Sequence, residues 1–161
     1  MKAKKILLTL CALMIMGGNS VMAQEKIDAP ELKNTVFDMG DKNVAYQQYF
    51  VGQSYLKMLT TTGVPIGNVT FEPGCRNNWH IHHKGGQILL VTAGRGYYQE
   101  WGKPAQELHP GDVVNIGSGV KHWHGAAPDS WFAHLAVEIP AEGASNEWLE
   151  PVSDEDYGKL K

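Results

Sequence analysis

The chain has 161 residues, with 14 Lys and Arg against 17 Asp and Glu, which gives a formal net charge of −3 at pH 7. A chain of this length forms one compact domain that buries about two thirds of its unfolded surface. The acidic balance, without a basic cluster beyond the first residues, excludes the charge pattern of a nucleic-acid-binding protein.

The N-terminus has the pattern of a secretory signal peptide. Three lysines within residues 2–5 precede the apolar run "ILLTLCALMIM", and "VMA" before Gln24 provides a small-residue cleavage site. We expect residues 1–23 to be removed after Ala23 and the protein to be exported to the periplasm. Removal of three lysines with this segment takes the net charge to about −6 and leaves 138 residues.

The two cysteines have different expected fates. Cys11 lies inside the apolar run and follows Leu10, where a lipoprotein signal requires a small residue, so lipidation is the less favoured alternative. Only Cys75 remains in the mature chain, and we interpret it as a buried, inert thiol. No later segment approaches the length of a membrane span, so we expect no membrane contact after cleavage.

The mature chain is predicted to contain an extended arm at 24–43 and a β domain at 44–161. The arm is polar, contains Pro30 and has no regular period. After it, short apolar or alternating runs are separated by Gly and Pro every 8 to 12 residues, which indicates an antiparallel barrel or sandwich rather than βαβ units. These runs are "YQQYFVG", "SYLKMLTT", "IGNVTFEPG", "WHIHH", "QILLVTAG", "GYYQEWG", "AQELHPGD", "VVNIGSG", "HWHGAA" and "WFAHLAVEIP".

The C-terminus predicts a short helix from about Ser153 to Leu160. Ser153 followed three residues later by Asp156 resembles a capping box, with Asp in place of the usual Glu or Gln.

Two segments carry pairs of histidines at strand spacing. Side chains at i and i+2 of a strand share a face, so His80 and His82 project together, as do His122 and His124. If the two strands are neighbours in a barrel, four imidazoles converge on its interior, and Gln87 begins the strand that returns from the intervening turn.

A shared metal would satisfy this group at once. Unpartnered buried polar groups each cost about 1–3 kcal/mol. Imidazoles suit Zn, Cu, Fe and Ni, and a carboxamide oxygen is a neutral ligand that Mn also tolerates. The alternative is a set of core histidines that are hydrogen-bonded to one another and to the backbone.

The spacing in "GCRNNWHIHHKGGQILLVTAG" resembles the first motif of the cupins, a family of small β-barrels. Its characteristic positions are filled by Gly74, His80, His82, Gln87 and Gly94, with Gln87 where most cupins have glutamate. The resemblance implies an all-β fold: a cupin antiparallel β-barrel (double-stranded β-helix, jelly-roll type), here with the N-terminal arm and the short C-terminal helix.

The segment "GDVVNIGSGVKHWHGA" is similar to the second cupin motif. Gly111, Gly119 and His122 match it, while Gly117 stands in place of the usual proline and Ala126 in place of the usual asparagine. Both departures fall at turn or supporting positions rather than at ligands.

A narrower resemblance links the chain to manganese cupins that include bacterial hydroxynitrile lyases. It rests on "FEPGCRNNWHIH", "HPGDVV", "KHWHGAAP", "HLAVE" and "WLEPVSDEDY". It implies His80, His82, Gln87 and His122 as metal ligands, and His124 and His134 as catalytic residues. The turn between His82 and Gln87 is one residue longer than in that group, which could displace Gln87. Similar sequences also occur in cupins associated with carboxymuconolactone decarboxylase-like proteins.

Three functions remain open from the sequence. The favoured one is a metal-dependent lyase or isomerase acting on a small carbonyl or oxygenated compound, with cyanohydrin lyase activity as the concrete case. The alternatives are an Fe-dependent dioxygenase and a non-catalytic cupin that binds a metal or a small ligand. We expect a divalent transition metal (Mn first, then Fe, Ni or Zn), a small-molecule substrate, and a homodimer or homotetramer.

Overall fold

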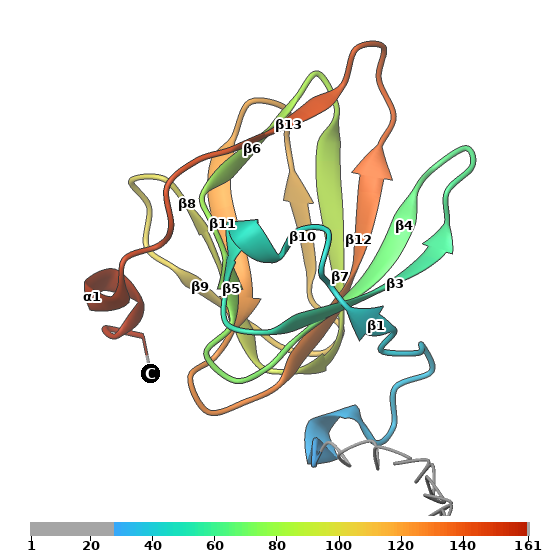
Figure 1. The fold of residues 1–161 in the computed structure, drawn as a ribbon. Coiled ribbons are helices and arrows are strands. Elements are labelled where there is room, and N and C mark those ends of the chain that lie inside the picture. Colours follow the sequence, from blue (N-terminus) through green and yellow to red (C-terminus); the bar gives the residue numbers. More distant parts are fainter. Residues whose placement is uncertain (1–27, 161) are drawn as a thin grey trace, which may run out of the picture.

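The fold consists of two antiparallel sheets packed face to face as a jelly-roll barrel (Figure 1). It is seen in a computed structural model that describes residues 28–160. The predicted signal peptide and residues 24–27 of the arm lie outside the described residues. Within 28–160, no helix has the length and apolar character needed to cross a membrane.

The first sheet has six strands in the spatial order β1-β3-β4-β12-β7-β10. They are β1 (Asp41–Lys42), β3 (Ser54–Thr60), β4 (Ile66–Phe71), β12 (Phe132–Ile139), β7 (Gly86–Gly94) and β10 (Val113–Ile116).

The second sheet follows the order β13-β6-β11-β5-β2, and β8 pairs with both β11 and β9. Its strands are β13 (Ser145–Trp148), β6 (His80–His83), β11 (Lys121–Ala126), β5 (Arg76–Asn77), β2 (Phe50–Val51), β8 (Gly96–Glu100) and β9 (Gln106–Leu108). The described helices are two 3₁₀ turns, η1 (Pro30–Leu32) and η2 (Gln47–Tyr49), and α1 (Asp154–Tyr157).

Each of the ten runs predicted as strands contains one. In several of them, such as β6, β7 and β10, the side chains alternate between the barrel interior and the outside. In β7, for example, Gln87, Leu89, Val91 and Ala93 are buried while the residues between them are half-buried. The motif glycine Gly94 is required by the backbone at this turn. It has φ +69, and a Cβ there would collide with the carbonyl oxygen of Trp131.

Three strands have no sequence signal. β1 and β5 are two residues long, and β13 is polar and largely exposed, so none shows alternation. They form because a longer neighbour supplies the pairing, as β6 does along the whole of β13. Since β1 pairs with β3, the sheet begins two residues before the predicted end of the arm.

The C-terminal helix begins as predicted and is shorter than expected. The Ser153 hydroxyl accepts a hydrogen bond from the Asp156 backbone N–H at 3.0 Å. The helix ends after Tyr157, where Gly158 donates to the Asp154 carbonyl at 2.9 Å.

The C-terminal segment is held to the barrel by a group that we call the outer clamp, formed by Arg76, Val152, Asp154 and Tyr157. The Arg76 guanidinium lies 4.2 Å from the Tyr157 ring centroid, donates to the Val152 carbonyl at 3.2 Å and pairs with Asp154. The Tyr157 hydroxyl donates to the Ala126 carbonyl at 2.7 Å.

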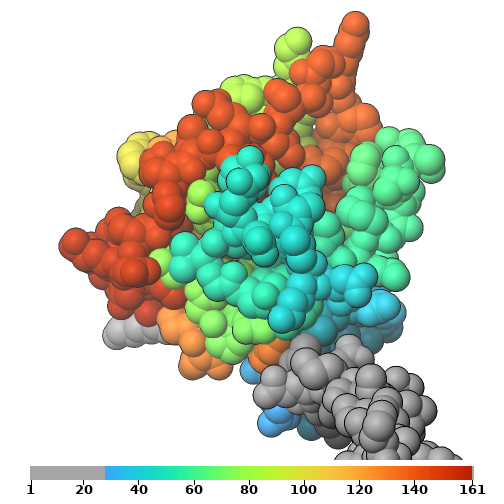
Figure 2. All heavy atoms as spheres, viewed as in Figure 1, coloured from blue at the N-terminus to red at the C-terminus, as the bar shows by residue number. Residues whose placement is uncertain are grey.

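The space between the sheets holds both an apolar core and the histidines. Phe71 and Phe132 are fully buried, and their ring centroids each lie 5.5 Å from that of His134. On the molecular face seen in Figure 2, the cyan segment around η2 and β2 lies between the red C-terminal segment and the green β3–β4 hairpin.

Candidate metal centre

Three histidines converge from neighbouring strands. His80 and His82 lie on β6 and His122 lies on β11, where it is the direct partner of His80 in the ladder. One ring nitrogen from each lies within 4.8 Å of those from the other two. The strand pairing therefore brings together three of the four residues predicted as ligands.

In each of these three rings, Nδ1 lies within hydrogen-bond distance of an oxygen. A carbonyl or amide oxygen only accepts, so each Nδ1 carries the proton and each Nε2 presents a lone pair. The Nε2 atoms of His82 and His122 are buried with no hydrogen-bond partner among the described residues. The partners of Nδ1 in His80, His82 and His122 are the Asn78 carbonyl (2.9 Å), the Asn146 Oδ1 (2.8 Å) and the Val120 carbonyl (2.9 Å).

Gln87 contributes a further lone pair. Its Nε2 donates to Glu138 Oε1 at 2.5 Å, which leaves its own Oε1 buried without a partner among the described residues. Gln87 lines the same cavity as His80 and His82. Lys84 in the turn before Gln87 adopts φ 64, and Gln87 still reaches the cavity despite the longer turn.

The four groups fit a divalent transition metal. Three imidazole nitrogens and an amide oxygen all present lone pairs, and no donor of the group faces them, so the atoms cannot satisfy one another. Such a set matches the N and O ligands of first-row metals. Oxygens behind the metal-binding rings fix the tautomer and orientation, as the outer partners of metal-bound histidines do.

The environment keeps the imidazoles of His80 and His122 neutral. Burial lowers the pKa of His122 to about 4, against the opposing effect of the Val120 carbonyl. Burial also lowers the pKa of His80 well below its usual range, and repulsion from His122 adds to this shift. Neutral imidazole is the form that binds metal.

His124 and His134 form a second pair behind the first three histidines. His124 lines the cavity, and its Nδ1 lies 3.2 Å from His134 Nε2. His134 is fully buried and does not line the cavity, so it can affect a substrate only through His124. Burial lowers the pKa of His134 to about 4 and that of His124 well below its usual range.

Asn77 orients His124, a role that the sequence did not suggest. Its Oδ1 accepts from the His124 backbone N–H at 3.0 Å, so its Nδ2 is turned toward the imidazole and lies 3.1 Å from Nε2. The same Nδ2 lies 3.3 Å from Nδ1, so Asn77 contacts both nitrogens of the His124 ring. Asn77 comes from β5, one of the strands without a sequence signal.

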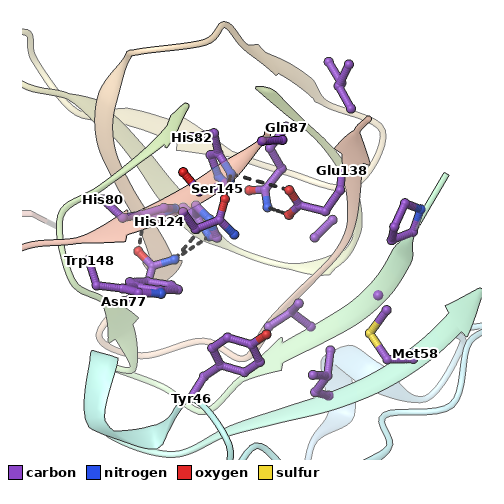
Figure 3. Close-up of a pocket in the computed structure, with 18 of the residues that line it drawn as sticks. Tyr46, Met58, Asn77, His80, His82, Gln87, His124, Glu138, Ser145 and Trp148 are labelled. Atoms are coloured by element: carbon purple, nitrogen blue, oxygen red, sulfur yellow. Dashed lines mark hydrogen bonds and ion pairs between the residues drawn. The ribbon is translucent and has the colours of Figure 1, made fainter. Parts of the chain in front are cut away.

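A cavity of about 510 Å³ opens beside the histidines (Figure 3). Its polar end is formed by His80, His82, Gln87, His124 and Glu138, and its walls are largely apolar. The walls include Tyr46, Phe50, Leu56, Met58, Val69, Ala136, Ile139 and Trp148. This combination of apolar walls and a few convergent polar groups is typical of small-molecule sites.

Besides Asn77, three further residues of the site were missed in the sequence interpretation. Asn146 and Trp148 come from β13; Trp148 stacks on His80 with ring centroids 4.7 Å apart. Glu138 holds both Gln87 and His82, with its Oε2 3.4 Å from His82 Nδ1. Strand alternation could have found Glu138, since His134, Ala136 and Glu138 fall on one face of "HLAVE".

Glu138 places a negative charge next to candidate ligands that include an uncharged amide. Burial opposes ionisation of Glu138, but the hydrogen bonds from His82 and Gln87 outweigh it and lower the pKa of the carboxyl. A carboxylate therefore lies directly behind two of the candidate ligands.

The remaining titratable residues of interest lie elsewhere. His83 points away from the cavity and pairs with Glu147 at 2.7 Å, with both side chains about half exposed. Cys75 is buried as expected, and burial raises the pKa of its thiol to about 12, which makes it unreactive.

The fold is a jelly-roll barrel, and three histidines from two adjacent strands lie close together inside it. These two features place the protein in the class of small β-barrels with a candidate metal centre. Residues 67–137 match the cupin domain family. The chain is 51% identical over 90 residues to an (R)-mandelonitrile lyase of Granulicella tundricola, which covers 56% of this chain and 68% of the relative. The protein belongs to the cupin family.

Two further comparisons agree with this assignment. The crystal structure of a cupin-like protein from Thermotoga maritima superposes with a TM-score of 0.73 and 43% identity, over 79% of this chain and 97% of the other. A germin-like protein of Arabidopsis thaliana (subfamily 1 member 4) is 29% identical over 132 residues, covering 78% of this chain and 55% of the relative.

Proposed function

We propose that the protein is a metal-dependent lyase that cleaves or forms cyanohydrins of small carbonyl compounds. The observation that carries the proposal is the set of lone pairs without donors at His82, Gln87 and His122. His82 and Gln87 line the polar end of a cavity with apolar walls, and His122 lies beside His82 in the histidine cluster. The similarity to an (R)-mandelonitrile lyase supports a lyase as the class of enzyme.

The proposed ligands are His80, His82, Gln87 and His122, with manganese as the first candidate and Fe, Ni or Zn as alternatives. When bound, the metal supplies a Lewis acid that stabilises a developing alkoxide or polarises a carbonyl oxygen.

His124 is the proposed proton carrier, because it is the imidazole of the second pair that reaches the cavity. In cyanohydrin cleavage it takes the hydroxyl proton at Nε2, in place of its contact with Asn77. The bond to the nitrile carbon then breaks, cyanide leaves with the electron pair, and His124 returns the proton to give hydrogen cyanide. His134 shares the Nδ1 proton and thereby stabilises the cationic ring.

The apolar walls favour a substrate with an apolar substituent on the carbonyl carbon, for which mandelonitrile is a suitable probe. As further proposals, the mature protein begins at Gln24, resides in the periplasm and forms a homodimer or homotetramer.

The test is turnover by the purified mature protein after reconstitution with Mn, Fe, Ni or Zn. We expect one metal per chain and release of benzaldehyde and hydrogen cyanide from mandelonitrile. Metal removal should abolish turnover, and His83→Ala, which replaces a histidine of β6 outside the cavity, should leave it unchanged. One metal per chain with turnover of catechol-type substrates alone would indicate a dioxygenase, and no turnover of either would indicate a binding protein.

A further inference from the structure

Glu138 and Gln87 are direct partners in the antiparallel ladder between β12 and β7. Directly opposite residues project to the same face of a sheet, here the cavity. The Gln87 Nε2 donates to Glu138 Oε1 at 2.5 Å, and Oε2 of the same carboxylate lies 3.4 Å from His82 Nδ1. One carboxylate thus lies behind two of the proposed ligands, as Figure 3 shows.

This contact determines which end of the Gln87 amide faces the histidines. The two ends of a carboxamide have nearly the same shape, but one accepts hydrogen bonds and the other donates them. An ionised carboxylate only accepts, so it holds the NH₂ group and turns Oε1 toward the cluster. Without it, the NH₂ group has acceptors available at the unpartnered Nε2 atoms of His82 and His122, and such contacts would occupy the nitrogens that a metal needs.

Glu138 also supplies charge. Of the described side chains that line the cavity, it is the one Asp, Glu, Lys or Arg. Imidazole and amide ligands carry no charge, so this carboxylate, one hydrogen bond away from Gln87, would partly compensate the charge of a bound dication.

We propose that Glu138 is a positioning residue that orients the Gln87 amide for metal binding. The inference rests on the proposed metal site and adds to it a residue outside the ligand set. Outer partners of metal ligands typically contribute 10- to 100-fold to metal affinity.

The experiment measures Mn(II) affinity by calorimetry, with the absorption spectrum of the Co(II)-loaded protein as a report on ligand geometry. Glu138→Ala should weaken Mn(II) binding about 10- to 100-fold and change the Co(II) spectrum. Glu138→Gln, which keeps an acceptor oxygen for the amide and loses the charge, should be less affected. Glu147→Ala is the matched control. It removes a carboxylate on β13 that pairs with the half-exposed His83 outside the cavity, and it should leave Mn(II) affinity unchanged.

A second arm tests whether Glu138 acts through Gln87. In a Gln87→Ala background, the further change Glu138→Ala should weaken Mn(II) binding clearly less than it does in the wild type, because no amide remains to be oriented and only the charge and the His82 contact are lost. The melting temperature of each metal-free variant verifies that it folds.

The outcomes separate this inference from the proposed function. Wild-type affinity in Glu138→Ala would overturn the inference alone, as would equal losses in Glu138→Ala and Glu138→Gln, or an undiminished loss in the Gln87→Ala background. Failure of the wild-type protein to bind Mn(II), Co(II) or the other metals would overturn the metal site itself.

Discussion

Arg76 and Asn77 are adjacent and buried on strand β5, yet they belong to two polar groups of opposite character. Arg76 enters the outer clamp, where a cation meets a carboxylate, a carbonyl and the face of an aromatic ring. Asn77 enters the barrel interior, where His82, Gln87 and His122 present lone pairs to one another. Donors meet acceptors in the first group, whereas acceptors meet acceptors in the second.

The difference separates a structural cluster from a binding site. In the outer clamp, the charge of Arg76 is paired with Asp154 and the Val152 carbonyl has a donor, so these contacts stabilise the fold without any bound ligand. The inner cluster leaves buried acceptors unpaired, and each such group costs about 1–3 kcal/mol until a cation binds. We therefore expect ligand binding and catalysis to depend on the inner cluster, and stability of the metal-free protein to depend on the outer one.

The largest expected effect is on catalysis. His124→Ala should lower mandelonitrile turnover by about 10²- to 10⁴-fold and leave metal content unchanged, because His124 lies beside the ligands rather than among them. Steady-state kinetics together with metal analysis measures both quantities. Loss of metal would show that His124 is a ligand, and normal turnover would place the base elsewhere.

The next effect concerns metal binding. His122→Leu should weaken Mn(II) affinity by about 100-fold or more, because it removes one of four ligands. The metal-free variant should be about as stable as the wild type, since an apolar side chain of similar size replaces an unsatisfied acceptor. Calorimetry and thermal denaturation test the two parts, and a strongly destabilised metal-free variant would show that His122 is structural.

The metal-free protein should become less stable as the pH is lowered, because His134 is buried. Burial lowers its pKa from 6.5 to about 4, so below pH 6.5 the unfolded chain binds the proton more readily than the folded one. The free energy of unfolding is therefore lost as pH falls from 6.5 to 4, by about 3 kcal/mol for this one group at most. Urea denaturation at several pH values measures the slope, which His134→Gln should reduce; an identical slope would contradict the assignment.

A change in the outer clamp should have the opposite effect to His122→Leu: it should lower stability and leave metal affinity unchanged. Arg76→Met should lower the free energy of unfolding by about 2 kcal/mol, because the Val152 carbonyl loses its donor and Tyr157 its cationic partner. Mn(II) affinity should stay within about twofold of wild type. A loss of metal binding without destabilisation would remove the distinction between the two groups.

The smallest expected effect comes from exchanging charge between Gln87 and Glu138. Gln87→Glu alone places two carboxylates at hydrogen-bond distance and should destabilise the metal-free protein by about 1 kcal/mol. It should keep the metal and reduce turnover, because a charged ligand lowers Lewis acidity. The exchange Gln87→Glu with Glu138→Gln should restore stability, as measured by thermal denaturation, and persistence of the loss would argue against direct contact of the two side chains.

Much of the fold could be predicted because strand alternation and turn residues are local properties of the chain. The ten predicted strands and the Ser153 cap required only the period of two and a known capping pattern. The strands β1, β5 and β13 could not be predicted, because their pairing partners rather than their own residues cause them to form. The sequence likewise predicted that His80 and His82 share a face, since the spacing i and i+2 ensures it.

The sequence by itself determined which imidazoles face the interior, whereas only the tertiary structure decided what lies behind them. Asn146 is 64 positions from His82 in the chain and contacts it because β13 pairs with β6. Glu138 is 56 positions away and contacts it from the end of β12 that lines the cavity. Such contacts depend on strand order and register, which no local pattern encodes. For the same reason, the carboxylate behind Gln87 and the arrangement of His134 behind His124 emerged only from the packed barrel.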